Sequence, residues 1–271
     1  MKTDDSKLGM SILISHPDSY SIEEQIPLFA DAGFDSFFLS CGVTEDFSKI
    51  PIWAEIAERC NIQFEAVHAP SKHVDGVWSG NEYGDRYRQD IESIIDLCSQ
   101  GSVSKLVVHV GVYSSVPVTD IGLNFWNTLE QYAKKRGVRI CYENSNVPAH
   151  FEAVVNNSDL YHGICHDIGH QNCYTPTVKY QCLYGERILY THIHDNFGAL
   201  KKGESCDLHL LPLDGNINWT LYFRELYDAG YIGTLNLELS CFHSEHYRNM
   251  SFREFVNASY RRITQLSKIQ I

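Results

Sequence analysis

The chain has 271 residues, of which 44% are hydrophobic and 12% aromatic, and its formal net charge is −12 at pH 7. This apolar content supplies a continuous core and excludes a disordered chain. The excess of 34 acidic over 22 basic residues disfavours binding to duplex nucleic acid, which depends on neutralising phosphates with Lys and Arg. No run reaches the ~20 apolar residues that a membrane span needs, and the first seven residues do not resemble a secretory signal. We therefore expect one cytoplasmic globular domain over residues 1–271, with its nine cysteines reduced.

Short apolar, β-rich runs alternate with longer amphipathic stretches along the whole chain, which is typical of repeated βα units around a parallel sheet. The expected strands are Leu8–Ile14, Ser36–Leu39, Gln63–His68, Lys105–His109, Arg139–Glu143, His162–Asp167, Ile188–His192 and Thr234–Leu239. The expected helices are one from the Ser21-x-x-Glu24 capping box to about Ala32, then Asp85–Gln100, Gly122–Arg136, Trp219–Ala229 and Ser251–Lys268, with shorter ones near His150–Asn156 and Thr177–Tyr184. Eight such units predict a (β/α)8 TIM barrel, which typically needs roughly 250 residues.

Metal-competent side chains recur at the carboxyl ends of these strands, where all strands of a barrel converge on one mouth. They are His68, His109, Glu143, Asp167, His192 and Glu238, with His170, Asp207 and His209 in the loops that follow. A single histidine in an apolar run is more often a satisfied core side chain than a ligand. Six polar groups at the same rim are costly to bury unless something compensates them. We therefore expect one to three divalent ions, Zn²⁺ or Mn²⁺, as cofactors.

Other polar residues carry weaker signals. Strand alternation points His166 away from the pocket if Asp167 points in. His194 is expected to support a ligand from the second shell, to contact substrate or to serve structure, and neither His166 nor His194 is expected to be a metal ligand. A substrate contact is also open to Lys201, although surface solvation is the favoured explanation for that lysine. For His16, just after the first strand, loop solvent is the favoured environment.

Several short motifs occur in an order and spacing that resemble the xylose-isomerase-like TIM-barrel superfamily. This superfamily includes sugar and sugar-phosphate isomerases and epimerases together with the endonuclease-IV family, also called AP endonuclease family 2. The motifs are Val67-His68-Ala69-Pro70, Val108-His109-Val110-Gly111, Tyr142-Glu143-Asn144, Asp167-Ile168-Gly169-His170, His192-Ile193-His194-Asp195-Asn196, Asp207-Leu208-His209, Asp214-Gly215-Asn216-Ile217-Asn218-Trp219 and Leu237-Glu238.

The resemblance implies two different ligand sets. In the epimerases it implies one metal held by Glu143, Asp167, His192 and Glu238, with the two glutamates as acid and base and His170 on substrate oxygens. In the endonuclease-IV family it implies three metals, held by three sets of residues. These sets are His68, His109 and Glu143; Asp167, His192 and Glu238; and His170, Asp207 and His209. The acidity of the chain and the Asn144-Ser145-Asn146-Val147-Pro148 continuation depart from the nucleases.

We therefore expect a metal-dependent isomerase or epimerase that acts on a small sugar, sugar phosphate or polyol by enediolate-type proton transfer, with Glu143 and Glu238 as the catalytic residues. A multi-zinc phosphoester hydrolase of endonuclease-IV type and a dehydratase of hydroxy-ketones are the enzymatic alternatives. A non-catalytic metal-binding or sugar-binding barrel is the alternative from another class. It predicts no turnover despite bound metal.

Overall fold

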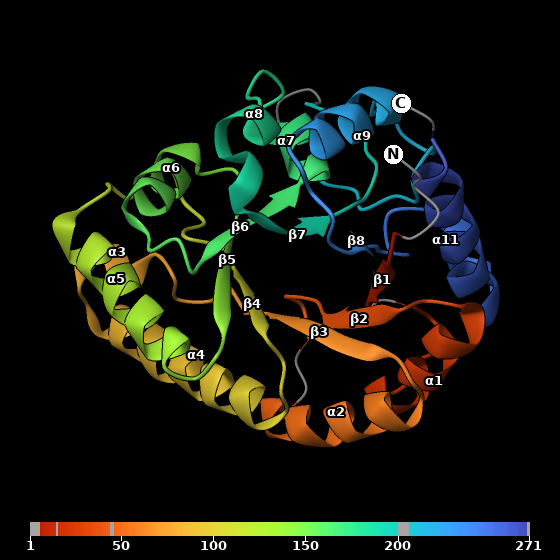
Figure 1. Ribbon diagram of the computed structural model, residues 1–271, viewed down its shortest axis with the longest axis horizontal. Coiled ribbons are helices and arrows are strands. Elements are labelled where there is room, and N and C mark those ends of the chain that lie inside the picture. Colours follow the sequence, from red (N-terminus) through yellow and green to blue (C-terminus); the bar gives the residue numbers. More distant parts are fainter. Residues whose placement is uncertain (1–5, 15, 44–45, 200–205, 270–271) are drawn as a thin grey trace.

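Eight parallel strands form the centre of the protein, as seen in a computed structural model that describes residues 6–14, 16–43, 46–199 and 206–269 (Figure 1). The strands are β1 (Leu8–Ser11), β2 (Ser36–Leu39), β3 (Gln63–His68), β4 (Lys105–Val108), β5 (Arg139–Glu143), β6 (Gly163–Asp167), β7 (Ile188–His192) and β8 (Leu235–Leu237). They pair in the order β7-β6-β5-β4-β3-β2-β1-β8. Ile193 joins the two ends, because its N–H donates to the Asn236 carbonyl at 2.8 Å. The predicted (β/α)8 TIM barrel is confirmed.

The predicted bounds of β2, β3, β5 and β7 agree with the structure, and the other strands are shorter than expected. β4 ends at Val108 and β8 at Leu237, so His109 and Glu238 lie just beyond their strands. At β8 the cause is visible in the hydrogen bonds, because the Leu239 N–H donates to the Ser11 hydroxyl at 3.2 Å instead of to a strand carbonyl.

The helices lie around the outside of the sheet (Figure 1). They are α1 (Ile22–Ala32), α2 (Ile50–Arg59), α3 (Gly76–Ser79), α4 (Glu82–Gln100), α5 (Asp120–Lys134), α6 (Pro148–Asn157), α7 (Ile168–Tyr174), α8 (Tyr180–Tyr184), α9 (Trp219–Asp228), α10 (Glu245–Arg248) and α11 (Phe252–Ser267). The predicted capping box at Ser21 is present, and Gly33 ends α1 with a φ of 104°. The apolar spacing of the sequence had not predicted four of these helices, α2, α3, α7 and α10.

A small apolar layer inside the barrel determines which side chains reach the mouth. This layer consists of Phe38, Ala66, Val107, Cys141, Cys165 and Tyr190, all fully buried. Because strand side chains alternate with a period of two, the residues two positions further along point in the same direction. Those residues are His68, His109, Glu143, Asp167 and His192, together with Ser40 after β2. The strand period therefore directs a set of imidazoles and carboxylates toward one end of the barrel.

None of the described helices combines the length and apolar character that a membrane span requires. All nine cysteines are free, and five of them are buried.

Candidate metal centre

Four buried side chains at the ends of β5, β6, β7 and β8 form what we call the first cluster: Glu143, Asp167, His192 and Glu238. One ligand atom from each lies within 4.8 Å of the others. The Nδ1 atom of His192 is 2.6 Å from Glu143 Oε1 and 3.2 Å from Glu238 Oε2. Three carboxylates thus face one imidazole, and none of these four side chains is more than 7% exposed.

Two further histidines lie against the other oxygen of Glu143. His68 at the end of β3 places Nε2 2.7 Å from Glu143 Oε2, and His109 after β4 places Nε2 2.8 Å from the same oxygen. Glu143 therefore presents one oxygen to His192 and the other to the histidine pair. A carboxylate with potential metal-ligating nitrogens beside each of its oxygens is suited to bridge two cations.

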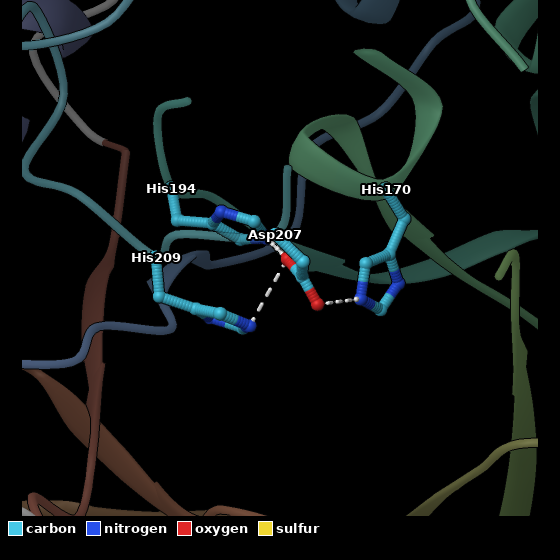
Figure 2. Close-up of side chains that lie close together, drawn as sticks. All are labelled: His170, His194, Asp207 and His209. Atoms are coloured by element: carbon cyan, nitrogen blue, oxygen red, sulfur yellow. Dashed lines mark hydrogen bonds and ion pairs between the residues drawn. The ribbon is translucent and has the colours of Figure 1, made fainter. Parts of the chain in front are cut away.

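A second cluster lies beside the first and consists of His170, His194, Asp207 and His209 (Figure 2). His170 comes from α7 and His194 follows β7, while Asp207 and His209 belong to the segment before α9. Asp207 lies between the imidazoles: Oδ2 is 3.2 Å from His170 Nε2, and Oδ1 is 3.2 Å from His209 Nε2.

The backbone fixes which nitrogen of three histidines carries hydrogen. Nδ1 of His68, His170 and His209 lies 2.9–3.0 Å from the carbonyls of Ala69, Asn144 and Glu238 respectively. A carbonyl oxygen can only accept, so each Nδ1 must donate and each Nε2 keeps its lone pair when the ring is neutral. All three Nε2 atoms nevertheless face carboxylate oxygens. An Nε2 lone pair and a carboxylate oxygen are both acceptors and repel each other, so either a second proton on the ring or a cation must lie between them. The donation of one ring nitrogen to a carbonyl is also the usual arrangement of metal-binding histidines.

Other buried polar atoms in the pocket have no hydrogen-bond partner among the described residues. They are His109 Nε2, Asp167 Oδ2, His192 Nε2, both ring nitrogens of His194, and Asp207 Oδ1. Buried polar groups are normally satisfied, so such a concentration at one place indicates a missing partner. Imidazole nitrogens and carboxylate oxygens are the donors that Zn²⁺ and Mn²⁺ accept, and these residues fit a divalent ion.

Carboxylates and imidazoles of the two clusters shift one another's pKa values toward the charged forms. Burial by itself raises the pKa of Glu143, but His192, His68 and His109 outweigh this effect and hold the pKa well below its usual range. Burial lowers the pKa of His209, yet Asp207 and Glu238 raise it to about 10. In the absence of an ion, these effects favour the ionised form of Glu143 and the protonated form of His209.

Neighbouring polar residues fix the positions of the ligand-bearing strands. The Asn144 side chain donates to the Asp167 carbonyl and accepts from the Asp167 N–H, both at 2.8 Å, which aligns β5 with β6. Asp195 accepts hydrogen bonds from the N–H groups of Leu213 and Ile217 and from the Trp219 indole. Asp195 therefore organises the turn before α9.

The structure places the remaining candidates as follows. His166 points away from the pocket and bonds Gln171 at 2.7 Å. Lys201 lies outside the described residues. The expectation of solvent around His16 is wrong, because the ring is buried and packs edge-on against Phe252 at 5.3 Å. Phe252 is the first residue of α11, so this helix covers the His16 ring and excludes solvent from it.

Cys41, just after β2, is a pocket residue that the sequence analysis missed. Its sulfur lies within 4.8 Å of ligand atoms of His68 and Glu238. Desolvation, followed by the charges of Glu238 and Glu143, raises the pKa of its thiol to about 12. The residue lies on the same rim as the histidines, and its position directly after a strand was the available signal.

A family model described as xylose isomerase-like TIM barrel matches residues 26–254. The chain belongs to this family. Among curated relatives, the uncharacterized protein MJ1311 of Methanocaldococcus jannaschii is 26% identical, with 98% of this chain and 94% of the relative covered. The uncharacterized protein y4fM of Sinorhizobium fredii is 30% identical over 167 residues, which are 55% of this chain and 51% of the relative. The chain thus spans about half the length of that relative.

Solved structures with a similar fold include sugar epimerases. The D-psicose 3-epimerase of Clostridium cellulolyticum H10, solved with D-tagatose, superposes with a TM-score of 0.78 over 97% of this chain and 99% of the epimerase. Its sequence identity to this chain is 12%, so the likeness concerns the fold.

Proposed function

We propose that the chain is a metal-dependent isomerase or epimerase of a small sugar, sugar phosphate or polyol. The observation that carries the proposal is the first cluster, in which carboxylates from β5 and from the end of β8 lie within 4.8 Å of each other beside Asp167 and His192. Two carboxylates on one pocket can serve as base and acid for one carbon atom of a bound substrate. The sugar epimerases among the structural neighbours support this substrate class.

Glu143, Asp167, His192 and Glu238 would hold the catalytic ion. When bound, a divalent ion polarises the substrate carbonyl and stabilises negative charge on oxygen. Glu143 is buried completely, whereas Glu238 is 5% exposed. One carboxylate removes the proton from the carbon beside the carbonyl, and the C–H electron pair moves to the carbonyl oxygen as an enediolate forms. The other carboxylate donates a proton to the opposite face of that carbon, and it must first take this proton from solvent, because the neighbouring histidines lower the pKa of both glutamates. His170 and His194 face the same pocket as substrate contacts.

Deuterium exchange tests this proposal. Protein loaded with Mn²⁺ or Zn²⁺ is incubated in D2O with free ketoses, polyol-derived ketones and ketose phosphates, and products are analysed by NMR. We expect one substrate class to gain deuterium at the carbon whose configuration or oxidation changes. Glu143→Gln and Glu238→Gln should each lower turnover by about 10²–10⁴-fold, the usual contribution of a positioned acid or base.

Glu130→Gln is the matched control for these variants. Glu130 is also buried, but it lies on α5, where it accepts a hydrogen bond from the Tyr142 hydroxyl at 2.8 Å. This variant should keep wild-type turnover. Full activity of Glu143→Gln, or the absence of exchange with every member of the panel, would contradict the proposal.

The histidine pair and the second cluster favour a second candidate, a multi-metal phosphoester hydrolase. Ligand groups for additional ions lie around Glu143 and Asp207 at the same rim. Such an enzyme uses adjacent ions to activate water and to stabilise the leaving oxygen. A phosphodiester and an abasic-site duplex in the same panel separate the two functions, since only the hydrolase releases product from them.

A further inference from the structure

We infer that Cys173 and Cys206 are an oxidation site, at which a low-molecular-weight disulfide such as oxidised glutathione converts the two thiols into a reversible disulfide bond. Both are free thiols here, with Cys173 buried on α7 and Cys206 half-buried directly before Asp207. Their side chains are in hydrogen-bond contact. Neither sulfur belongs to the ligand groups of the two clusters, so the site is separate from the candidate metal centre.

α7 meets the segment that begins at Cys206 through two neighbouring side-chain contacts. His170 and Cys173 are three positions apart on α7, and side chains at this spacing share one face of a helix. Opposite them, Asp207 Oδ2 lies 3.2 Å from His170 Nε2 (Figure 2), and the preceding residue, Cys206, contacts Cys173. The approach of the two sulfurs therefore follows from the way the two backbones are held together.

Hydrogen bonds of the residue before Cys173 fix this part of α7 on the loop after β7. The Asn172 amide donates to Asn196 Oδ1 at 2.8 Å and to Asn216 Oδ1 at 3.0 Å. The Gly198 N–H donates to the same Asn196 oxygen at 2.9 Å. Groups that a fold holds together react as if they were present at a high effective concentration. The bonded sulfurs of a disulfide lie about 2.05 Å apart, so two thiols in contact need only a short further approach.

The different surroundings of the two sulfurs set the order of the reaction. Cys206 is half-buried and open to a small reagent, whereas Cys173 is only 5% exposed. Desolvation, followed by the hydrogen bond with Cys206, raises the pKa of the Cys173 thiol well above its usual range, so few molecules carry the reactive thiolate at this position. Cys206 is therefore the thiol that meets the reagent, and Cys173 reacts afterwards from its place beside Cys206.

The reaction consists of two thiol–disulfide exchanges. The Cys206 sulfur loses its proton and attacks one sulfur of oxidised glutathione, whose S–S bond breaks and releases one glutathione thiol. The Cys173 sulfur then loses its proton and attacks Cys206, and the bond from Cys206 to glutathione breaks to release a second glutathione thiol. The two cysteines lose two electrons and two protons, and oxidised glutathione gains both. Because Cys206 directly precedes Asp207, the new bond ties the backbone beside that carboxylate to α7.

Peptide mapping tests the assignment without an activity assay. The reduced full-length chain is incubated with oxidised glutathione at mildly alkaline pH, remaining thiols are alkylated, and the digest is analysed by mass spectrometry. We expect one cross-linked peptide pair that contains Cys173 and Cys206, with no glutathione on either residue, and its loss on treatment with dithiothreitol. In Cys173→Ser the reaction should stop with glutathione bound to Cys206, whereas Cys206→Ser should leave Cys173 unmodified.

Cys182→Ser is the matched control, since Cys182 is an exposed cysteine on α8. This variant should form the cross-link as the wild type does. Glutathione that stays on Cys206 in the wild-type chain would overturn the assignment, as would a disulfide of either residue with another cysteine or the absence of any reaction at both. Far-UV circular dichroism checks the folding of the variants. If a variant does not fold, the peptide map of the wild-type chain decides the question by itself.

Discussion

Gly169 leaves room for the His194 ring, so a side chain at this position should destabilise the fold. In Gly169→Ala the new Cβ meets His194 Cε1 at 1.9 Å, and the ring or the start of α7 must shift. We expect a destabilisation of about 1–3 kcal/mol from overpacking. Urea unfolding measures this loss.

Gly101→Ala is the control for this prediction, because its Cβ would meet Ile50 Cγ2 at 3.2 Å, far from the pocket residues. Wild-type stability in Gly169→Ala would contradict this prediction.

Much of the candidate site followed from counting along strands. His68, Glu143 and His192 terminate strands whose bounds were predicted correctly, and their inward direction follows from the strand period. The place of Cys41 just after β2 was a signal for the rim, but the distances of Cys41 and His194 to the clusters depend on loop conformation and could not be predicted. His209 illustrates this dependence: its φ is 47°, and its position is set by the bridge between Asp195 and Leu210.

At the scale of elements, His162 joins α5 to β5 and confers a pH dependence on the packing of that helix. Its Nδ1 accepts the Ile140 N–H at 2.9 Å, while Nε2 lies 3.1 Å from the Glu130 carbonyl, to which it must donate. Only the neutral ring makes both bonds. Burial lowers the pKa of His162 to about 4, against the opposing effects of the Glu130 carbonyl and Asp159, while Lys134 and Arg139 lower it slightly further.

The unfolded chain therefore binds this proton with a pKa near 6.5 and the folded chain only near 4, so stability is fully present above pH 6.5 and is lost as the pH falls toward 4. The loss amounts to about 3 kcal/mol for the whole window. Urea unfolding of the wild type and of His162→Gln between pH 7.5 and 4 should show a smaller pH dependence in the variant. Parallel pH profiles of the two proteins would refute this assignment.

The helices were predicted less completely than the strands, and the reason is physical. The long helices α4, α5 and α11 carry apolar residues at helical spacing over 15 to 19 residues, which identifies them directly. α3 and α10 have four residues each, and α7 has seven, too few for periodicity to appear. α2 begins with Ile50-Pro51, and proline there is compatible with a first turn as well as with a loop.

At the scale of the whole molecule, the barrel brings three buried carboxylates and the half-buried Asp207 to one end, where they repel one another. Glu143, Asp167 and Glu238 lie in one cluster, with Asp207 in the next. Ions bound only by the folded state stabilise it by RT ln(1 + [L]/Kd), or about 2.7 kcal/mol at a free concentration of 100 Kd. For a chain of this size that corresponds to a rise in Tm of roughly 5–10 °C.

Differential scanning calorimetry with EDTA and with excess Zn²⁺ or Mn²⁺ measures this shift. Asp167→Asn is the informative variant, because Asp167 Oδ2 is buried and has no hydrogen-bond partner among the described residues. It should melt higher than the wild type in EDTA, since one repulsive charge is gone, and it should gain less from added metal, since one ligand is gone. These opposite changes identify a cation-binding carboxylate. Asp167 also caps the N-terminus of α7, because its Oδ1 accepts the His170 N–H at 2.6 Å. A variant that loses the same stability in both buffers would show that this capping, and not cation binding, determines the effect of Asp167.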